Sequence, residues 1–368
     1  QFLARNCFHS GREDPPEHPG TLTLAWHQQG VWRWTGTKFV EYSKEELQGW
    51  ITRWLATTEH VTQTDDARDI SSVTQQVLAQ LMLTASEDRS WRAMQEGPER
   101  NHIWCGFQNG VLDLTLALTG FPELREQTPR WFSRGVFPFA WDPHAKAPLF
   151  QRCLLEWMCG DQAQIQLLQE FVGYCLVPDT SHEVALFLEG PGGNGKGCFC
   201  EAVQAMFGRD YYSAVDLDMF GHTFAPTDMV GKLINFASET KADAKLAVEM
   251  VKRMITGDEH TFQVKYKRGL TVRNTARQVV SWNQRPQIND PTNAFWRRVK
   301  LVPFLKSFPE STRDEGLKGK LAGEAPGIYN WALGGLRRLR EEGKFTPSLT
   351  AAEAAADFQG ESNPLGTY

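Results

Sequence analysis

Short apolar runs alternate with helical periodicity between residues 181 and 305. Residues 184–188, 233–237 and 278–282 are apolar runs of the length expected for buried strands. Between the last two, residues 244–255 repeat their apolar positions with a helical period. Strands that alternate with helices predict an α/β core with a largely parallel sheet, so we expect residues 181–305 to form one such domain.

The N-terminal residues have a different pattern. In residues 22–42, apolar and polar residues partly alternate around Gly30 and Gly36, which predicts short antiparallel strands joined by turns. Residues 44–84 carry apolar positions at helical spacing. We therefore expect residues 1–88 to form an α+β region, whose role the sequence leaves open. Three tryptophans of the strand segment either pack against the hairpin or stack on nucleic-acid bases: Trp26, Trp32 and Trp34.

Two mainly helical regions flank the α/β core. In residues 89–180, a turn into a strand at 109–113 and a proline-rich connection precede helical periodicity over 149–176. Residues 306–368 are also expected to be helical, with an amphipathic helix at 326–342. The expected fold is an α/β core that follows a mostly helical domain with a small β N-terminal part and precedes C-terminal helices.

The composition is that of a globular protein, with 41% hydrophobic and 23% charged residues. A length of 368 residues suggests two or three domains. The formal net charge of −5 argues against a protein that coats nucleic acid non-specifically, but it allows a local basic channel. No apolar run approaches the ~20 residues of a membrane span and no signal segment begins the chain, so we expect a cytoplasmic protein without a membrane partner.

Cysteine and histidine usage argues against a metal centre built from these residues. The seven cysteines include no Cys-x-x-Cys pair, and the nine histidines include no His-x-x-x-His pair. We expect reduced thiols in a cytosolic protein. The chain begins at Gln1 rather than Met, so we also expect it to be a piece of a longer protein or a processed chain.

A glycine-rich loop follows the first strand of the core. Residues 190–197 read Gly-Pro-Gly-Gly-Asn-Gly-Lys-Gly and fit the pattern G-x4-G-K between a strand and a helix. Glycines let the backbone turn its N–H groups toward a phosphate, and the helix directs its positive dipole end to the same point. The Lys196 ammonium would bind the β- and γ-phosphates. The predicted nucleotide-binding residues are Gly190, Gly192, Gly193, Asn194, Gly195, Lys196, Gly197 and Cys198.

One position of this loop departs from the usual pattern. The Ser or Thr that normally follows the lysine, and whose hydroxyl binds Mg²⁺, is Gly197 here. The next residue, Cys198, is a poor magnesium ligand. We therefore expect metal binding to depend on carboxylates, phosphates and water. Because of this departure, the alternative that the loop binds nucleotide but hydrolyses it poorly also remains.

Two later strands of the core end in polar side chains. The strand at 234–237 leads into Ser238 and Glu239, and the strand at 279–282 leads into Asn283. An acidic group at such a strand end binds the metal or orients the attacking water in phosphate-loop ATPases, so Glu239 is the candidate for that role and Ser238 for the magnesium shell. Asn283 is expected beside Glu239, where it would bond the γ-phosphate or the water. The alternative for Glu239 is a solvated surface position, and the alternative for Asn283 is a simple strand-ending residue in a turn.

Basic residues mark two further segments. Arg297 and Arg298 precede an apolar strand. They are either a solvated edge or, in a ring ATPase, an arginine finger inserted into the neighbouring subunit's site, and the sequence does not separate the two arginines. A basic hairpin around Gly269 is either solvated or a pore loop that grips a single-stranded backbone. Its predicted DNA contacts are Lys265, Tyr266, Lys267 and Arg268.

In this order, the motifs resemble those of the superfamily 3 helicases, and especially the phage/plasmid primase–helicase family, which includes poxvirus-type replication helicases. Motif A resembles residues 193–196, motif B the strand ending in Ser238 and Glu239, motif C the strand ending in Asn283, and the arginine pair follows. Flanking segments resemble those that surround the core in this family: residues 109–113, 142–150, 168–176 and 328–334.

The resemblance implies an AAA+-like phosphate-loop ATPase that forms a ring, usually a hexamer, around DNA and moves 3′ to 5′ on a single strand. It implies ATP and Mg²⁺ as cofactors and a primase or primase–polymerase domain or protein as a partner at the replication fork. The catalytic residues it implies are Lys196, Glu239, Asn283, Arg297 and Arg298.

The expected function is therefore that of an ATP-dependent DNA helicase in the replication of a phage, plasmid or similar mobile element. Two other functions remain open. One is a nucleotide-gated DNA-binding or origin scaffold with weak or no hydrolysis. The other is a phosphotransferase that uses the same loop on a small substrate, against which the arginine pair and the basic hairpin argue.

Overall fold

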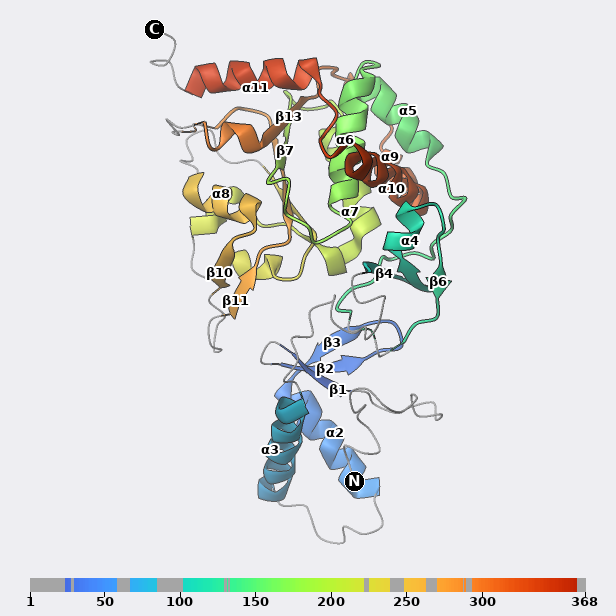
Figure 1. Ribbon diagram of the computed structural model, residues 1–368, viewed down its shortest axis with the longest axis vertical. Helices are drawn as coiled ribbons and strands as arrows, with labels where there is room; N and C mark the ends of the chain where they lie inside the picture. Colours follow the sequence, from blue (N-terminus) through green and yellow to red (C-terminus); the bar gives the residue numbers. More distant parts are fainter. Residues whose placement is uncertain are drawn as a thin grey trace. The chain divides into compact units, whose positions relative to one another are not determined.

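The structure, a computed structural model, divides into two compact units, residues 1–136 and 137–368 (Figure 1). The structure describes residues 24–27, 30–57, 67–84, 102–128, 131, 133–221, 225–238, 248–262, 270–286, 288 and 293–362.

The first unit begins with an antiparallel sheet of three strands in the order β1-β2-β3, as the alternating pattern predicts. The helix that follows starts at a reciprocal cap, in which the Ser43 amide donates to Glu46 and the Glu46 amide donates to Ser43. The predicted helical stretch is divided into two helices. The elements are β1 (Leu24–His27), β2 (Gly30–Trp34), β3 (Phe39–Tyr42), α2 (Lys44–Thr57) and α3 (Ala67–Thr84).

The tryptophans of this sheet contribute to packing. The rings of Trp34 and Phe39 lie 5.2 Å apart between centroids, and Trp32 packs against the same buried Phe39. The Trp26 side chain lies outside the described residues. The packing interpretation therefore holds for Trp32 and Trp34.

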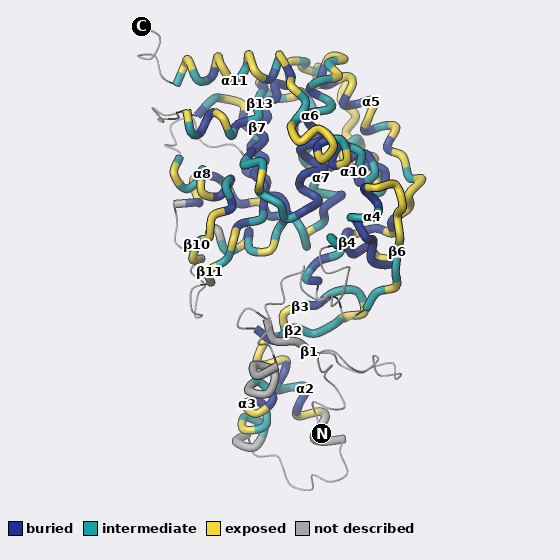
Figure 2. The backbone as a smooth tube through the Cα atoms, viewed as in Figure 1, coloured by how far each residue is buried: buried dark blue, intermediate teal, exposed yellow. Residues whose placement is uncertain are grey.

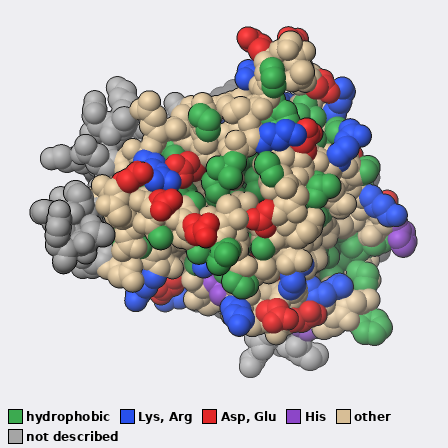
Figure 3. All heavy atoms as spheres, turned by 90° about the horizontal axis from the view of Figure 1, so that it is seen from above, with side chains coloured by type: hydrophobic (Ala, Val, Ile, Leu, Met, Phe, Trp, Pro, Cys, Tyr) green, Lys and Arg blue, Asp and Glu red, His purple; other side chains and the backbone are tan. Residues whose placement is uncertain are grey.

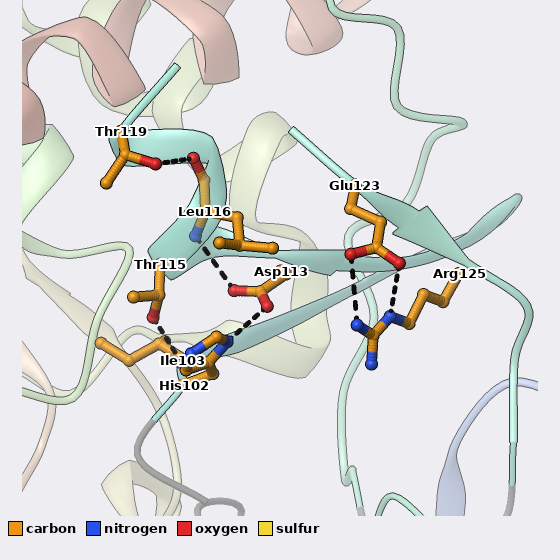
Figure 4. Close-up of polar contacts among 8 residues, drawn as sticks. All are labelled: His102, Ile103, Asp113, Thr115, Leu116, Thr119, Glu123 and Arg125. Atoms are coloured by element: carbon orange, nitrogen blue, oxygen red, sulfur yellow. Dashed lines mark hydrogen bonds and ion pairs between the residues drawn. The ribbon is translucent and has the colours of Figure 1, made fainter. Parts of the chain in front are cut away.

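A second antiparallel sheet, in the order β4-β5-β6, follows in the same unit, and its first hairpin contains the predicted turn at Asn109. The buried Asp113 carboxylate accepts from the Leu116 amide at 3.1 Å and hydrogen-bonds the His102 ring at 2.6 Å (Figure 4). Asp113 therefore caps a short helix and fixes the segment before the sheet. The elements are β4 (Trp104–Phe107), β5 (Gly110–Asp113), α4 (Leu114–Leu118) and β6 (Leu124–Arg125).

The second unit is built on a parallel sheet of five strands in the order β13-β7-β12-β9-β8. This sheet confirms the predicted α/β core. Because all neighbours are parallel, the carboxyl ends of the strands meet at one edge and the amino ends at the other. The strands are β7 (Ala185–Glu189), β8 (Tyr212–Ser213), β9 (Ile234–Ala237), β12 (Arg277–Trp282) and β13 (Val299–Pro303).

Helices cover both faces of this sheet. Figure 1 shows α6, α7 and α10 to one side and α8 to the other. The helices are α5 (Pro148–Trp157), α6 (Gln162–Tyr174), α7 (Lys196–Tyr211), α8 (Val248–Thr256), α9 (Leu317–Gly323), α10 (Ala325–Glu342) and α11 (Leu349–Ser362). A separate hairpin consists of β10 (Glu259–Phe262) and β11 (Leu270–Arg273). Short 3-10 turns are η1 (Leu217–Gly221), η2 (Ala225–Met229), η3 (Trp296–Arg298) and η4 (Glu310–Thr312).

The predicted helical stretch before the core is interrupted once. Cys159 and Gly160 have φ angles of 51° and 83°, so the chain turns out of α5 there. Asp161 then caps α6 by accepting from the Gln164 amide at 3.1 Å. The break lets α6 turn and pack along α10, where an added Cβ on Gly173 or Gly335 would overlap the backbone of the other helix.

The core of the second unit lies within the sheet and under its helices, where Figure 2 shows β7 and β13 as buried. One face of the sheet packs large aromatic side chains, with the Phe358 ring 5.3 Å from Trp282 and 5.1 Å from Trp296. Phe358 belongs to α11, so this C-terminal helix covers the strand that ends at Asn283 and the turn that contains Arg297.

The surface of the face seen in Figure 3 carries basic and acidic side chains interspersed with hydrophobic ones, without a large patch of one sign. In the part of the chain that the structure describes, no helix is long and apolar enough to cross a membrane. Within the same residues, no group of three or more His, Cys, Asp and Glu side chains is placed to hold a metal ion.

Candidate functional site

The glycine-rich loop connects β7 to α7 at the carboxyl edge of the sheet, and its conformation depends on glycine. Gly192, Gly193 and Gly195 have φ angles of 98°, 61° and 97°, in the left-handed region that other residues rarely adopt. An added Cβ on Gly195 would also overlap the indole of Trp157, a buried residue of α5. The loop is therefore pressed against α5 at the point where α7 begins, a contact that was not predicted because it joins distant parts of the sequence.

Lys196 is the first residue of α7 and is buried. Its ammonium donates to the Gly190 carbonyl at 2.5 Å, to Asn194 Oδ1 at 3.3 Å and to Asn283 Oδ1 at 3.2 Å. Two residues predicted separately, Lys196 and Asn283, are thus brought together across 87 positions of sequence. The left-handed glycines and the lysine at a helix start form a cradle that fits a phosphate chain.

Asn283 is held at the loop by the strand register and by an ion pair. Trp282 lies opposite Glu189 in the parallel pair of β12 and β7, so the next residue reaches the level of the loop. Arg285 then binds the Glu189 carboxylate through two nitrogens, at 2.7 and 3.1 Å, and binds Glu361 of α11 at 2.9 Å. The sequence analysis did not single out Arg285 or Glu189, because neither stands in a recognisable motif.

Ser238 follows β9 at the same edge of the sheet. Its amide and its hydroxyl both donate to the Asp216 carboxylate, at 2.9 and 3.1 Å. Asp216 was not predicted, since it follows β8, a strand of only two residues. Glu239 lies outside the described residues, so its position beside Asn283 stays a prediction.

The two residues after Lys196 have different surroundings. Gly197 is exposed, and a Cβ added to it would meet no other atom within 4 Å. Cys198 is half-buried, and burial raises the pKa of its thiol despite the opposing effect of Lys318. The neutral thiol is therefore favoured, which agrees with a weak affinity for magnesium.

The arginine pair lies away from the loop. Arg297 and Arg298 belong to η3, directly before β13, so they lie at the amino edge of the sheet. Arg298 donates to the Glu183 carboxylate at 2.8 Å and to the Ala294 carbonyl at 2.6 Å. Arg297 is exposed, and among the described residues its side chain has no hydrogen-bond or ion-pair partner.

The basic hairpin is described only at its base. Strands β10 and β11 pair from Glu259 opposite Arg273 to Phe262 opposite Leu270, which agrees with the predicted hairpin. The predicted DNA contacts lie outside the described residues: Lys265, Tyr266, Lys267 and Arg268.

Two family models match the chain. Residues 19–159 match the model described as "D5 N terminal like", and residues 188–298 match a family of unknown function, DUF5906. The second match runs from β7, through the loop, to the arginine pair.

A curated relative covers part of the same region. The chain is 24% identical over 214 residues to a protein of Acanthamoeba polyphaga mimivirus named "Putative helicase L207/L206". The match covers 51% of this chain and 22% of that protein, so the chain spans about a fifth of that relative's length.

The fold is found in solved structures of the NrS-1 C-terminal region. One apo structure has a TM-score of 0.56 at 13% identity, and an A-form apo structure has 0.54 at 13% identity. Both matches cover 92% of this chain and 72% of the other. The chain therefore carries a D5 N-terminal-like region followed by a DUF5906 region, which is the domain arrangement of the primase–helicase family that its motifs resemble.

Proposed function

We propose that the protein is an ATP-dependent DNA helicase of the superfamily 3 type, which moves along single-stranded DNA as a ring. The observation that carries this proposal is the 3.2 Å contact between the Lys196 ammonium and Asn283 Oδ1. It joins the phosphate loop to the polar end of the adjacent parallel strand, where a group that responds to the γ-phosphate belongs.

Some residues of the site would bind the nucleotide, and others would take part in its hydrolysis. The backbone of residues 190–197 holds the phosphates, and Lys196 neutralises charge on the β- and γ-phosphates. Asn283 contacts the γ-phosphate, while Glu239 orients the attacking water. Mg²⁺, when bound, would neutralise phosphate charge, with Glu239 and Ser238 in its shell. The Ser238 hydroxyl already donates to Asp216, which fixes the segment that leads to Glu239.

A ring is supported by where the arginine pair lies. In the parallel pair of β13 and β7, the arginines are at the amino edge and the loop is at the carboxyl edge. Five strand residues separate these edges, about 16 Å at ~3.3 Å per residue. An arginine at that distance serves a different subunit's site, as an arginine finger does in a ring. The family resemblance favours a hexamer.

Arg297 is the better candidate for the finger. Arg298 is bound to Glu183 and to a backbone carbonyl, so its guanidinium has a structural task within its own subunit. Arg297 is exposed beside it. We propose Arg297 as the residue that reaches the neighbouring nucleotide, and Arg298 as the residue that holds η3 in place.

DNA would be gripped at the tip of the β10–β11 hairpin. Lys265, Tyr266, Lys267 and Arg268 combine positive charge with an aromatic ring, which suits the phosphates and bases of a single strand. We further propose that the protein acts in the host-cell cytoplasm at a replication fork, with a primase or primase–polymerase domain or protein as partner.

The decisive experiment measures ATP turnover with Mg²⁺, with and without single-stranded DNA, for wild type and Lys196→Ala. We expect DNA to stimulate turnover and the variant to abolish it. Arg297→Ala should lose turnover but still bind ATP, whereas Arg298→Ala should mainly lower the melting temperature. Turnover that survives Lys196→Ala would refute the site. Unwinding that survives the double variant Lys265→Ala/Lys267→Ala would refute the hairpin assignment.

Gly197 favours one alternative, a nucleotide-gated scaffold on DNA. A loop that lacks the usual hydroxyl has one magnesium ligand fewer, which would slow hydrolysis more than binding. The same experiment separates the two functions. ATP binding without turnover, in the presence and absence of DNA, would favour the scaffold.

A further inference from the structure

The segment that follows β13 runs back along the phosphate loop. The Phe304 amide donates to the Glu189 carbonyl at 2.7 Å, and the Phe308 amide donates to the Gly193 carbonyl at 2.9 Å. The Asn194 side chain donates to the Phe304 carbonyl at 3.2 Å. These bonds use carbonyl groups and one side chain of the loop, not the backbone N–H groups that bind phosphate. The segment is therefore fixed beside the loop without occupying those N–H groups.

Arg313 stands at the end of this segment, directly against the loop. Its Nε donates to the Phe308 carbonyl at 3.0 Å, so the residue that binds Gly193 also orients the arginine. A Cβ added to Gly193 would overlap the Arg313 guanidinium. The side chain is exposed, and the atom that comes nearest to this added Cβ is the terminal nitrogen Nη2 of Arg313.

The neighbouring cations differ from Arg313 in having carboxylate partners. Lys306 binds Glu156 at 2.8 Å, Lys320 binds Asp314 at 2.6 Å, and Lys318 binds Glu201. No carboxylate among the described residues pairs with Arg313. Its charge is thus not neutralised within the described part of the subunit.

We propose that Arg313 is a phosphate ligand of its own subunit's nucleotide site, a second cation at the loop in addition to Lys196. This inference rests on the proposed function and adds to it a ligand that no motif identifies. A guanidinium presents a planar fork of donors that matches phosphate oxygens in a way that a lysine ammonium does not. The ligand class is the di- or triphosphate group of a nucleotide.

The test compares the unsubstituted 368-residue chain with Arg313→Gln and Arg313→Lys by calorimetric titration with ATP and with ADP in Mg²⁺. Gln keeps a donor near the Phe308 carbonyl but removes the charge, so ATP affinity should fall about ten- to a hundredfold. Lys keeps the charge without the fork, and its affinity should lie between those of Gln and wild type. A loss for ATP alone would assign Arg313 to the γ-phosphate, and a loss for both nucleotides to the β-phosphate.

Arg152→Ala is the matched control, because Arg152 is an exposed arginine in α5. It should bind ATP like wild type. Both Arg313 variants should melt at the wild-type temperature without nucleotide, since the Arg313 side chain makes one hydrogen bond to the rest of the described residues. If Arg313→Gln binds ATP and ADP within about twofold of wild type while Lys196→Ala does not bind, the assignment of Arg313 is refuted. If wild type binds neither nucleotide, the proposed function itself fails.

Discussion

At the scale of single residues, Gly197 offers a direct test of the magnesium binding that we propose for the site. A serine here would add a hydroxyl where most phosphate loops have one, and its Cβ meets open space. We expect Gly197→Ser to stabilise α7 by about 0.5 kcal/mol and to lower, several-fold, the Mg²⁺ concentration needed for half-maximal ATP turnover. Gly197→Ala is the control, because it should also stabilise α7 but adds no hydroxyl. Equal Mg²⁺ dependence of the two variants would contradict the prediction.

His182 makes the stability of the protein depend on pH. Burial lowers the pKa of His182, which packs edge-on against the rings of Tyr174 and Phe345. The unfolded chain therefore binds a proton more readily than the folded one, so stability is lost as the pH falls below about 6.5, the ordinary histidine pKa.

We expect His182→Phe, which keeps the ring contacts, to weaken this dependence. The measurement is the free energy of unfolding in urea between about pH 7.5 and 5 for both proteins. A variant curve parallel to that of wild type would show that another group is responsible.

Several of the predicted site residues lie in the segment that directly follows a buried strand. Lys196 and Asn283 are examples, because strand, loop and helix follow one another locally in the sequence. Asp216 and Arg285 bind partners 22 and 96 residues away, so their roles depend on the order of strands in the sheet. Nothing in the local sequence encodes that order, and the same holds for the contact of Arg313 with Gly193.

At the scale of elements, α6 and α10 are joined by a buried carboxylate. The Glu170 side chain accepts from Arg338 Nε at 2.6 Å, from the Thr346 amide at 2.7 Å and from the Thr346 hydroxyl at 2.5 Å. A glutamine would keep the shape of the side chain and lose its charge. Its NH₂ group would also face one of the donors on Arg338 or Thr346, where the carboxylate now accepts. We expect Glu170→Gln to lower the free energy of unfolding by about 2 kcal/mol in urea denaturation.

The control for this variant is Glu156→Gln. Glu156 pairs with Lys306, and about half of the Glu156 side chain and two-fifths of the Lys306 side chain are exposed to water. Such pairs contribute little, so the loss should stay within about 0.5 kcal/mol. Equal losses for the two variants would mean that burial of Glu170 has no energetic effect.

Three strands of the core, β7, β9 and β12, were predicted to within one or two residues, because buried parallel strands are short, continuous apolar runs. The two-residue strand β8 was not predicted. Helix boundaries were less evident. The break between α5 and α6 depends on a left-handed Cys159, a conformation that no local pattern indicated. Of the sheet β4-β5-β6, the sequence pattern predicted only the first turn. The strand β6 was not predicted, because it has two residues and is too short to show alternating apolar and polar positions.

At the scale of the whole molecule, every described residue assigned to nucleotide binding lies in the second unit. Residues 137–368 contain the loop, Asn283, Arg297 and Arg313, together with the helices that support them. We expect this fragment to unfold cooperatively on its own and to bind ATP within about threefold of the full chain. Circular dichroism and calorimetric titration test this. A fragment that lacks a melting transition would show that residues 1–136 are needed for the fold.

In the ring that we propose, the orientation of β13 gives every subunit two unlike ends, one that offers an arginine and one that receives it. Contacts between such ends are head-to-tail, and they have no two-fold symmetry. A linear oligomer then always leaves one nucleotide site without an arginine from a neighbouring subunit. Only closure of the oligomer into a ring completes that site. ATP turnover per subunit should accordingly rise with protein concentration until all rings are closed. A small fraction of Arg297→Ala chains mixed into wild type should also abolish turnover at the nucleotide sites of the wild-type subunits that they contact.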